Sequence, residues 1–347
     1  MADAHTLPLW GRDNALILKR ILSSPSTLQI ILKTRNEVHL LEKWLLHTFN
    51  IIEDTAKIII LDHMSTEKAI FDIYKRYAHR LIVLQYEGLV DSAHSPAKFQ
   101  NLYDAVCASA SFYALLDTDE FLCLYDGFKL VRNQKLISFL QANAQACFFP
   151  SLALENILGE DSVFAFYAET ARSCLLHGKP ILNTRQTHLW HGMAIGHNAD
   201  MPGAACSNTP LGLVLLHLTS WLPEQRIRAN MQKLVNFGVI TSEHDFYTVM
   251  TLDSESIFPE YLRTYIKNIR LLSDAKATQA AKEAALQKGF VTFAPEGKPL
   301  FSPATMRRDF KDFTTGTSVL SPLGMRPELF SNPRQRIHAA LTAQNPS

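Results

Sequence analysis

Residues 112–121 read Phe-Tyr-Ala-Leu-Leu-Asp-Thr-Asp-Glu-Phe, an apolar run that stops at three carboxylates within four positions. Five consecutive apolar residues are too few for a helix core but long enough for a strand buried on both faces. Because side chains alternate along a strand, we expect Asp117 and Asp119 to leave its end on the same side, with Thr118 turned away. Two carboxylates so close together predict a site for magnesium or manganese, which complete their coordination with water and substrate phosphates.

The same carboxylates also have a purely structural interpretation. A single Asp after a strand is most often a turn former or a helix N-cap. Three neighbouring acids, however, repel one another, which raises the free-energy cost of clustering them without a cation. Because perturbed clusters of this kind are more often functional than structural, we favour the metal site.

Strand-like and helix-like segments alternate as far as residue 149. Short apolar runs predict five strands, at residues 28–32, 57–61, 81–84, 112–116 and 147–149. Between the first four runs, apolar residues recur at helical spacing, and Pro96 marks the start of the third of these helices. The alternation predicts an α/β fold with a doubly wound, mostly parallel sheet and helices on both faces.

Polar residues follow three of the predicted strands directly. They are Thr34, Arg35 and Glu37 after the first strand, Asp62 after the second, and Asp117 and Asp119 after the fourth. Ligands of such sheets bind beyond the carboxyl ends of the strands, so we expect these side chains to converge at one edge. Neither G-x-G-x-x-G nor G-x-x-x-x-G-K follows the first strand, which removes the main support for a dinucleotide site or a P-loop.

Several short motifs together resemble those of the glycosyltransferase family 2-like enzymes of GT-A fold. They are Lys33-Thr34-Arg35-Asn36-Glu37, Trp44 with His47, Asp62 with Ser65, Gln100-Asn101, and Asp117-Thr118-Asp119-Glu120-Phe121. Members of that family carry similar R/K-N-E, D-x-x-S-T-D and D-x-D-E-F-L motifs, and the likeness extends over residues 28–220. The chain departs from the family pattern at Glu67, where Asp is usual, and at Tyr113, where Trp is frequent.

The resemblance implies roles for the motif residues. The donor's nucleotide pocket would be lined by Thr34, Arg35, Glu37, Asp62 and Asn101, with Asp62 near the base or the ribose. Asp117 and Asp119 would hold a Mn2+ or Mg2+ ion that bridges the donor diphosphate, and Asp119 would act directly in catalysis. For Arg35 and Glu37, an ion pair on the surface at a helix start is the structural alternative.

Candidates for a general base and for further metal ligands lie downstream. If the reaction inverts the sugar carbon, a carboxylate must take the proton of the acceptor hydroxyl. Glu155 is our first candidate, with Asp161 and Asp200 behind it. The resemblance points to His191 and His217 as further metal ligands, although a histidine after an apolar strand can equally be a core residue that is hydrogen-bonded to the backbone.

The resulting hypothesis is a metal-dependent glycosyltransferase that moves a sugar from a nucleotide diphosphate donor to a glycan or lipid-linked acceptor. The family resemblance suggests polysaccharide biosynthesis as its setting. A nucleotidyltransferase acting on sugar phosphates would also use paired carboxylates and a metal, but would release pyrophosphate. A non-catalytic nucleotide- or glycan-binding protein on the same scaffold is the third alternative, and the intact Asp117 and Asp119 pair counts against it.

Composition limits the compartment and the partners. The 34 basic and 33 acidic residues are balanced, so nothing points to nucleic acid as a partner. The five cysteines are an odd number and widely spaced, which favours free thiols in a reducing compartment. No stretch approaches the ~20 apolar residues of a membrane span. We therefore expect a cytoplasmic protein, or one peripheral to the inner face of a membrane.

The sequence predicts four segments. Residues 1–27 form an N-terminal lead, and residues 28–220 form the nucleotide-sugar-binding catalytic domain. Residues 221–302 form a helical extension, in which Pro223 starts the first helix, Gly238 ends it, and two more helices follow at 258–272 and 274–288. Residues 303–347, rich in Pro, Ser and Thr, form a weakly basic, loosely folded tail that could make a peripheral membrane contact.

Overall fold

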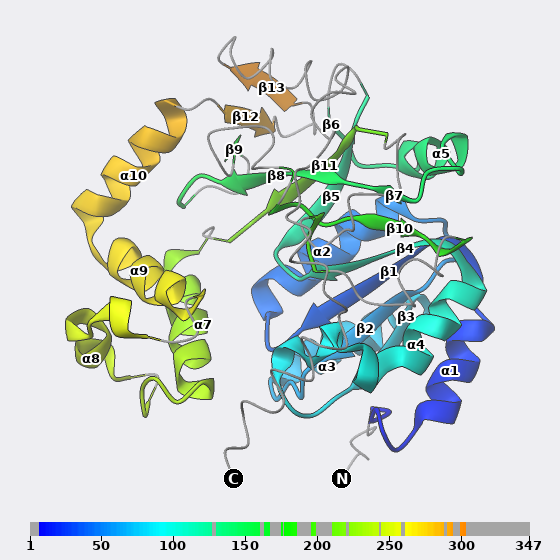
Figure 1. Ribbon diagram of the computed structural model, residues 1–347, viewed down its shortest axis with the longest axis horizontal. Helices are drawn as coiled ribbons and strands as arrows, with labels where there is room; N and C mark the ends of the chain where they lie inside the picture. The colour runs from blue at the N-terminus through cyan, green and yellow to red at the C-terminus, as the bar shows by residue number, and fades with distance from the viewer. Residues whose placement is uncertain are drawn as a thin grey trace, which may run out of the picture.

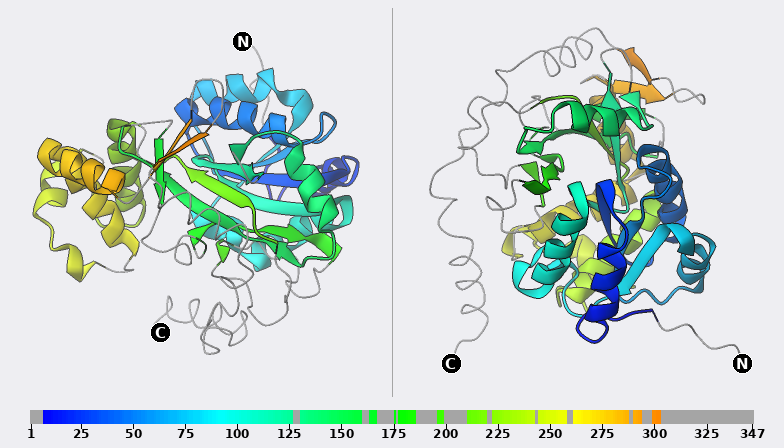
Figure 2. Two further views of the ribbon diagram at one scale, coloured as in Figure 1. Left: turned by 90° about the horizontal axis from the view of Figure 1, so that it is seen from above. Right: turned by 90° about the vertical axis from the view of Figure 1, so that its right-hand side faces the viewer.

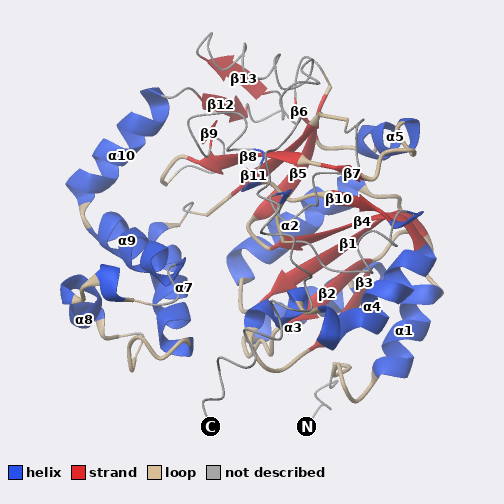
Figure 3. Ribbon diagram, in the orientation of Figure 1, coloured by secondary structure: helices blue, strands red, loops and turns tan. Residues whose placement is uncertain are grey.

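The computed structural model describes residues 7–126, 130–159, 163–166, 175, 177–185, 196–198, 210–219, 222–242, 244–257, 261–287, 290–293 and 299–302. Over these residues the chain builds two β-sheets with helices packed on them, and a group of helices at one side (Figures 1 and 3). The candidate site lies where the two sheets and that group of helices meet.

The first sheet has six strands in the order β3-β2-β1-β4-β10-β7. They are β1 (Ser26–Thr34), β2 (Ile58–Asp62), β3 (Leu81–Gln85), β4 (Ala110–Asp117), β7 (Phe148–Phe149) and β10 (Ile181–Asn183). β1 to β4 run parallel, and β10 and β7 extend the sheet through antiparallel pairs. The predicted doubly wound, mostly parallel α/β sheet is therefore confirmed.

Helices cover both faces of this sheet. They are α1 (Asn14–Leu22), α2 (Val38–Ile51), α3 (Lys68–Arg76) and α4 (Pro96–Ser109). Ile30 and Leu32 of β1 share a core with α2 and α3, whereas Ile31 between them shares a core with α1 and α4. Alternate side chains of one strand thus face opposite helix layers, which explains why the strands read as continuous apolar runs.

The N-terminal lead contributes to the fold, which the sequence analysis did not foresee. Besides forming α1, it runs along the free edge of β3. There the Trp10 N–H donates to the Gln85 carbonyl and the Gln85 N–H donates to the Pro8 carbonyl, both at 2.8 Å. The Trp10 ring stacks on Phe99 with a centroid distance of 5.2 Å. These contacts cover an edge strand whose open N–H and C=O groups would otherwise invite pairing with another chain.

The second sheet has seven strands in the order β13-β12-β9-β8-β11-β5-β6, and the sequence analysis did not predict it. Its strands are β5 (Glu120–Tyr125), β6 (Leu130–Val131), β8 (Ser151–Asn156), β9 (Val163–Phe166), β11 (Leu213–His217), β12 (Phe290–Phe293) and β13 (Pro299–Ser302). β4 of the first sheet ends at Asp117 and β5 of the second begins at Glu120, so the carboxylate motif forms the crossing between the sheets.

The C-terminal extension contains a group of helices with its own core, but the helices end at Gln287, and residues 290–293 and 299–302 of the predicted helical segment are strands of the second sheet. The helices of this group are α7 (Pro223–Asn236), α8 (Phe246–Thr251), α9 (Tyr261–Ser273) and α10 (Ala275–Gln287). They pack through Met231, Leu234, Ile266 and Ile269, and Figures 1 and 2 show α8 to α10 at one side of the sheets. The chain then returns as β12, which pairs with β9 of the second sheet.

A further helix, α5 (Lys135–Ala142), packs beside the second sheet, and short 3-10 turns occupy Ala78–Arg80, Val90–His94 and Ser254–Ser256. Cys107, Cys123 and Cys147 are free thiols, while the other two cysteines lie outside the described residues. Among the helices in the described part of the chain, none has the length and apolar character needed to cross a membrane.

Helix α2 is joined to β5 through two buried side chains. Trp44 Nε1 donates to the Glu120 carbonyl at 2.7 Å, and His47 Nε2 donates to the Leu122 carbonyl at 2.6 Å. The His47 ring is buried and meets Phe121 edge-on. Burial lowers the pKa of His47 to about 4, because the charged imidazolium would lose its hydration.

We predict that His47 makes folding sensitive to mild acid. Its pKa is lower in the folded state, so between about pH 7 and about pH 5 the unfolded chain takes up the proton, and stability falls by on the order of 2 kcal/mol. His47→Gln should remove that part of the loss. Urea unfolding at the two pH values measures it. His79→Gln, at an exposed position, is the control and should keep the wild-type pH dependence. Equal pH dependence in His47→Gln and wild type would contradict the prediction.

Candidate active site at the junction of the two sheets

The parallel register brings the predicted strand-end residues to one edge of the first sheet. Thr34 pairs with Asp62 across β1 and β2, and Lys33 pairs with Asp117 across β1 and β4. The last positions of three strands thus lie side by side, although they are far apart in the sequence. This edge is the carboxyl end of the sheet, where ligands of such folds bind.

Asp117 is held between two lysines. Lys33 Nζ lies 3.2 Å from Asp117 Oδ1, and Lys179 Nζ lies 3.4 Å from Asp117 Oδ2. Burial alone would raise the pKa of Asp117, but the two ammonium groups outweigh it and hold that pKa well below its ordinary value. Asp117 is therefore ionised at neutral pH.

Lys179 is almost fully buried, with 3% of its side chain exposed. Its ammonium group also lies 3.6 Å from Glu120 Oε2, and the same Glu120 oxygen accepts the Asp117 N–H at 2.8 Å. The glycine before Lys179 lets the chain pack closely against β8, because a Cβ on Gly178 would stand 1.8 Å from the Ser151 carbonyl oxygen. Ser151 Oγ then accepts the Lys179 N–H at 2.9 Å and donates to the Lys179 carbonyl at 2.7 Å, which fixes the lysine beside β8.

Asp119 has a different pair of partners. His217 Nε2, at the end of β11, and Arg226 Nη1, in the first turns of α7, each lie 3.4 Å from Asp119 Oδ2. Burial would raise the pKa of Asp119, but His217 and Arg226 hold it well below its ordinary value. Burial would likewise lower the pKa of His217, and Asp119 together with Glu120 and Glu155 raises it instead. The contact between Asp119 and His217 therefore favours the ionised form of Asp119 and the protonated form of His217.

The second sheet places Glu155 beside His217. In the register of the sheet His217 lies opposite Glu120 of β5 on one side and opposite Glu155 of β8 on the other. Directly opposed residues share a face, so the three side chains form one row. The Thr219 hydroxyl donates to Glu155 Oε1 at 2.5 Å. The candidate base thus lies on the same row as the candidate metal ligand.

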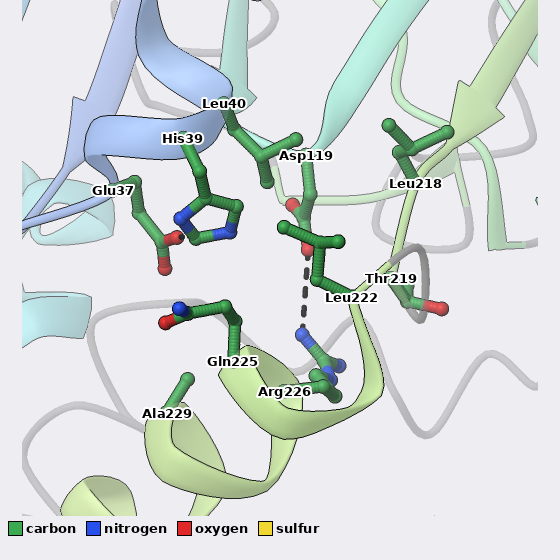
Figure 4. Close-up of a pocket in the computed structure, with 10 residues that line it drawn as sticks. All are labelled: Glu37, His39, Leu40, Asp119, Leu218, Thr219, Leu222, Gln225, Arg226 and Ala229. Atoms are coloured by element: carbon green, nitrogen blue, oxygen red, sulfur yellow. Dashed lines mark hydrogen bonds and ion pairs between the residues drawn. The ribbon is translucent and has the colours of Figure 1, made fainter. Parts of the chain in front are cut away.

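A small pocket opens beside this cluster (Figure 4). It is lined by Glu37, His39, Leu40, Asp119, Leu218, Thr219, Leu222, Gln225, Arg226 and Ala229. Its volume of about 30 Å³ is room for roughly one water-sized group. Burial and the nearby Asp119 raise the pKa of Glu37 to about 7, so this carboxyl is close to half protonated at neutral pH.

The loops after β1 and β2 are joined to each other. Asn36 and Met64 both have a φ of +52°, the left-handed region that costs free energy for residues other than glycine. Asn36 Oδ1 accepts the N–H groups of Thr66 and Glu67 at 2.9 and 3.2 Å, and the Asn36 N–H donates to the Ser65 hydroxyl at 2.9 Å. These bonds hold the two strained loops in one shape.

The buried side chain of Asp62 stabilises the same loops. It is completely buried and accepts the Ser65 N–H at 2.7 Å and the Tyr74 hydroxyl at 2.6 Å. Arg35 Nη1 donates to His63 Nδ1 at 3.3 Å, and His63 Nε2 donates to the Gly88 carbonyl at 2.6 Å. A direct contact between Asp62 and a nucleotide stays a prediction, whereas its structural role is visible.

The other predicted site residues fall into three groups. Thr34 is buried, and its hydroxyl has no hydrogen-bond partner in the described part of the chain. Asn101 is exposed on α4, and within the described ranges it makes no hydrogen bond or ion pair with the cluster. His191, Asp161 and Asp200 lie outside the described residues.

Four basic residues around the carboxylates were not assigned to the site from the sequence. They are Lys33, Lys179, Arg226 and Lys233. Lys33 follows an apolar strand, and Lys179 stands in a Gly-Lys-Pro turn, and either could have been noticed there. Arg226 and Lys233 lie in an ordinary amphipathic helix, where basic residues are usually solvated, and only the fold brings them to the site.

The donor chemistry of the cluster fits a metal ion at Asp119 better than at Asp117. Among the described residues no group of three or more His, Cys, Asp or Glu side chains is arranged to hold a metal ion. Magnesium and manganese sites that act on phosphates, however, often use only one or two protein ligands. Asp119 and His217 supply one oxygen and one nitrogen 3.4 Å apart, whereas Asp117 is already neutralised by two lysines.

Comparisons with known proteins gave only distant likenesses. No protein-family model matches the chain, and no curated protein matches it in sequence. Among solved structures, residues 1–349 of S. aureus TarS in complex with UDP-GlcNAc are 13% identical, with a TM-score of 0.33, over 80% of this chain and 99% of that one. The mannosyltransferase PcManGT from Pyrobaculum calidifontis, in complex with GDP-Man and Mn2+, is 14% identical, with a TM-score of 0.37, over 91% of each chain. These TM-scores are too low for either likeness to indicate a function.

We predict that Asn36 stabilises the joined loops in two separable ways. Asn36→Gly removes the side-chain acceptor but tolerates the left-handed backbone, and should cost about 1 kcal/mol. Asn36→Ala adds the left-handed strain and should cost about 1 kcal/mol more. Denaturant unfolding of wild type and both variants should therefore give three distinct stabilities in that order. If the alanine variant were as stable as the glycine variant, backbone strain at this position would be negligible.

Proposed function

We propose that the protein is a metal-dependent glycosyltransferase of GT-A type that takes a sugar from a nucleotide diphosphate donor. The observation that carries the proposal is the pair Asp117 and Asp119 at the crossing between the two sheets, each flanked by two basic groups. The motif Asp117-Thr118-Asp119-Glu120-Phe121 that makes this crossing is also the most specific part of the family resemblance.

The site is built to receive a negatively charged leaving group. Asp117 and Asp119 are ionised, and Lys33, Lys179 and Arg226 surround them. In a transfer from a nucleotide sugar, negative charge develops on the departing diphosphate. Fixed cations in a partly buried site stabilise that charge more than water would. The positions of these cations therefore favour donor cleavage with release of a nucleoside diphosphate.

A divalent ion would be held by Asp119 and His217, with His191 as a proposed further ligand. Such an ion, when bound, supplies a Lewis acid that neutralises the diphosphate oxygens. Asp117 is paired with Lys33 and Lys179. We therefore propose that it orients the donor and that Asp119 is the main carboxylate ligand of the ion.

We propose a place for the nucleotide beyond the carboxyl ends of β1 and β2. The nucleotide would lie on the loops after β1 and β2, against Thr34, Arg35 and Glu37, in the shape that Asp62 and Asn36 fix. A contact with Asn101 would require the donor to reach the exposed side of α4.

On the other side of the cluster lies the proposed acceptor site. Glu155, oriented by the Thr219 hydroxyl, would take the proton of the acceptor hydroxyl if the reaction inverts the sugar carbon. A glycan or a lipid-linked acceptor, and a peripheral membrane contact through residues 303–347, are part of this proposal.

We predict that Asp119→Asn abolishes transfer and removes the manganese-dependent part of nucleoside diphosphate affinity. The variant keeps the size of the side chain but loses the charge that binds the ion. Calorimetry with UDP and with GDP, each with and without manganese, measures the effect. Asp72→Asn, on the exposed side of α3, is the control and should behave as wild type. Equal manganese-dependent affinity in Asp119→Asn and wild type would refute the metal role. Release of pyrophosphate in place of a nucleoside diphosphate would favour a nucleotidyltransferase.

A second variant tests whether His217 is a metal ligand or a core residue. If His217 binds the ion, His217→Ala should raise the manganese concentration for half-activity by roughly tenfold, a typical loss for one metal ligand or its support. The melting temperature should fall only modestly, because the ring is partly exposed and Arg226 still pairs with Asp119. A core histidine predicts the reverse, with stability lost and the manganese titration unchanged. Thermal unfolding and a manganese titration of the same variant separate the two.

A further inference from the structure

One face of α7 points basic and polar side chains at the carboxylates of the candidate site. Arg226, Asn230 and Lys233 follow one another at helical spacing and so share a face. Arg226 reaches Asp119, as the dashed line in Figure 4 shows, and Ala229 beside it leaves room at the pocket. Lys233 is near enough to Glu37 and Asp119 to affect the charge of this region. The helical extension therefore supplies one wall of the site.

The hydrogen bonding of this wall is incomplete. Arg226 Nε is buried and has no partner in the part of the chain that the structure describes. Asn230 is fully buried at 0% exposure, and within the same described residues neither its amide nitrogen nor its amide oxygen has a partner. Buried polar groups are normally paired, and each exception calls for an explanation. Arg226 lines the pocket, so its unpaired Nε–H donor is explained if a ligand with acceptor oxygens completes it.

The balance of charge identifies the kind of ligand. The cluster holds five carboxyl groups, those of Glu37, Asp117, Asp119, Glu120 and Glu155, and four basic residues, Lys33, Lys179, Arg226 and Lys233. A divalent ion at Asp119 would add two positive charges and leave the basic groups in excess. An anion with several oxygen acceptors suits such a surplus, and a diphosphate is the anion that the proposed donor would bring. Arg226 is best placed to bind it, because its planar guanidinium has donors to spare beyond the single 3.4 Å contact with Asp119.

We propose that Arg226 is an exchangeable counterion, paired with Asp119 in the free protein and with the donor diphosphate once Asp119 binds the metal ion. The inference rests on the proposed function and adds a coupling to it. Arg226 and His217 both contact the same oxygen of Asp119, Oδ2, so a metal ion that binds this oxygen together with His217 would compete with Arg226. When Arg226 is displaced, the diphosphate gives it a new partner. Binding of metal and of diphosphate therefore becomes cooperative through this one side chain.

The test uses the full chain, manganese and inorganic pyrophosphate, which carries the diphosphate without a base. Arg226→Gln removes the charge and keeps a polar, although shorter, side chain. Manganese alone should bind this variant roughly fivefold more tightly, because its competitor for Asp119 is gone. Pyrophosphate at saturating manganese should bind it roughly tenfold more weakly, because a charged hydrogen-bond partner is lost. Arg228→Gln, at an exposed position of the same helix, should change neither constant.

Tighter binding of manganese together with weaker binding of pyrophosphate distinguishes an exchange of Arg226 between partners from a purely structural ion pair. If Arg226→Gln weakens both ligands, or changes neither while wild type binds both, the exchange is wrong and the proposed function survives. If wild type binds neither manganese nor pyrophosphate, the metal-dependent transferase itself is refuted. Should Arg226→Gln fail to fold, Arg226→Lys serves instead. It keeps the charge but not the planar fork, so pyrophosphate must bind more weakly than to wild type while manganese alone binds no more weakly, and any other result overturns the exchange.

Discussion

The chain passes from one sheet to the other between Asp117 and Glu120, and this crossing constrains the rest of the molecule. Apolar strands lie immediately before and after it, so the three carboxylates of the motif are carried into a partly buried position. Burial of charge without partners is strongly unfavourable. The fold meets this requirement by bringing basic groups from β1, from the turn before β10, from β11 and from α7 to the same place. One short turn therefore determines where four distant segments must lie.

Much of the first sheet could be predicted because its signals are local. Each of the strands β1 to β4 is a short apolar run bounded by polar residues, and the parallel arrangement follows from the helices between them. The convergence of Lys33, Thr34, Asp62 and Asp117 at one edge follows in turn from that arrangement. The carboxylate motif itself was evident from the sequence.

The second sheet and the basic residues contributed by α7 could not be predicted, because no local signal in the sequence marks them. β9 pairs with β12 across more than a hundred residues of chain, and no local pattern marks such a partner. The α1 helix was missed because residues 1–27, which contain it, were treated only as an N-terminal lead. Arg226 looks like an ordinary surface residue in the sequence, and the burial and pairing of both Lys179 and Arg226 depend on tertiary packing.

Asp62 could be predicted only in part. The family resemblance implied a place for it near the base or the ribose of a nucleotide, which stays a prediction, and its visible contacts are with Ser65 and Tyr74. A fully buried carboxylate of this kind acts by holding the backbone around it in place.

The path of the chain after β11 has a consequence for how the protein could diversify. The helices α7 to α10 begin after one strand of the second sheet and end at β12, which rejoins the same sheet through β9. In topological terms they are an insertion between two strands, anchored at both ends. Domains accept insertions most readily when the entry and exit points belong to one rigid framework. The outer helices of this insertion can therefore vary in length and surface without disturbing the strands, provided that α7 keeps the face that meets the carboxylates.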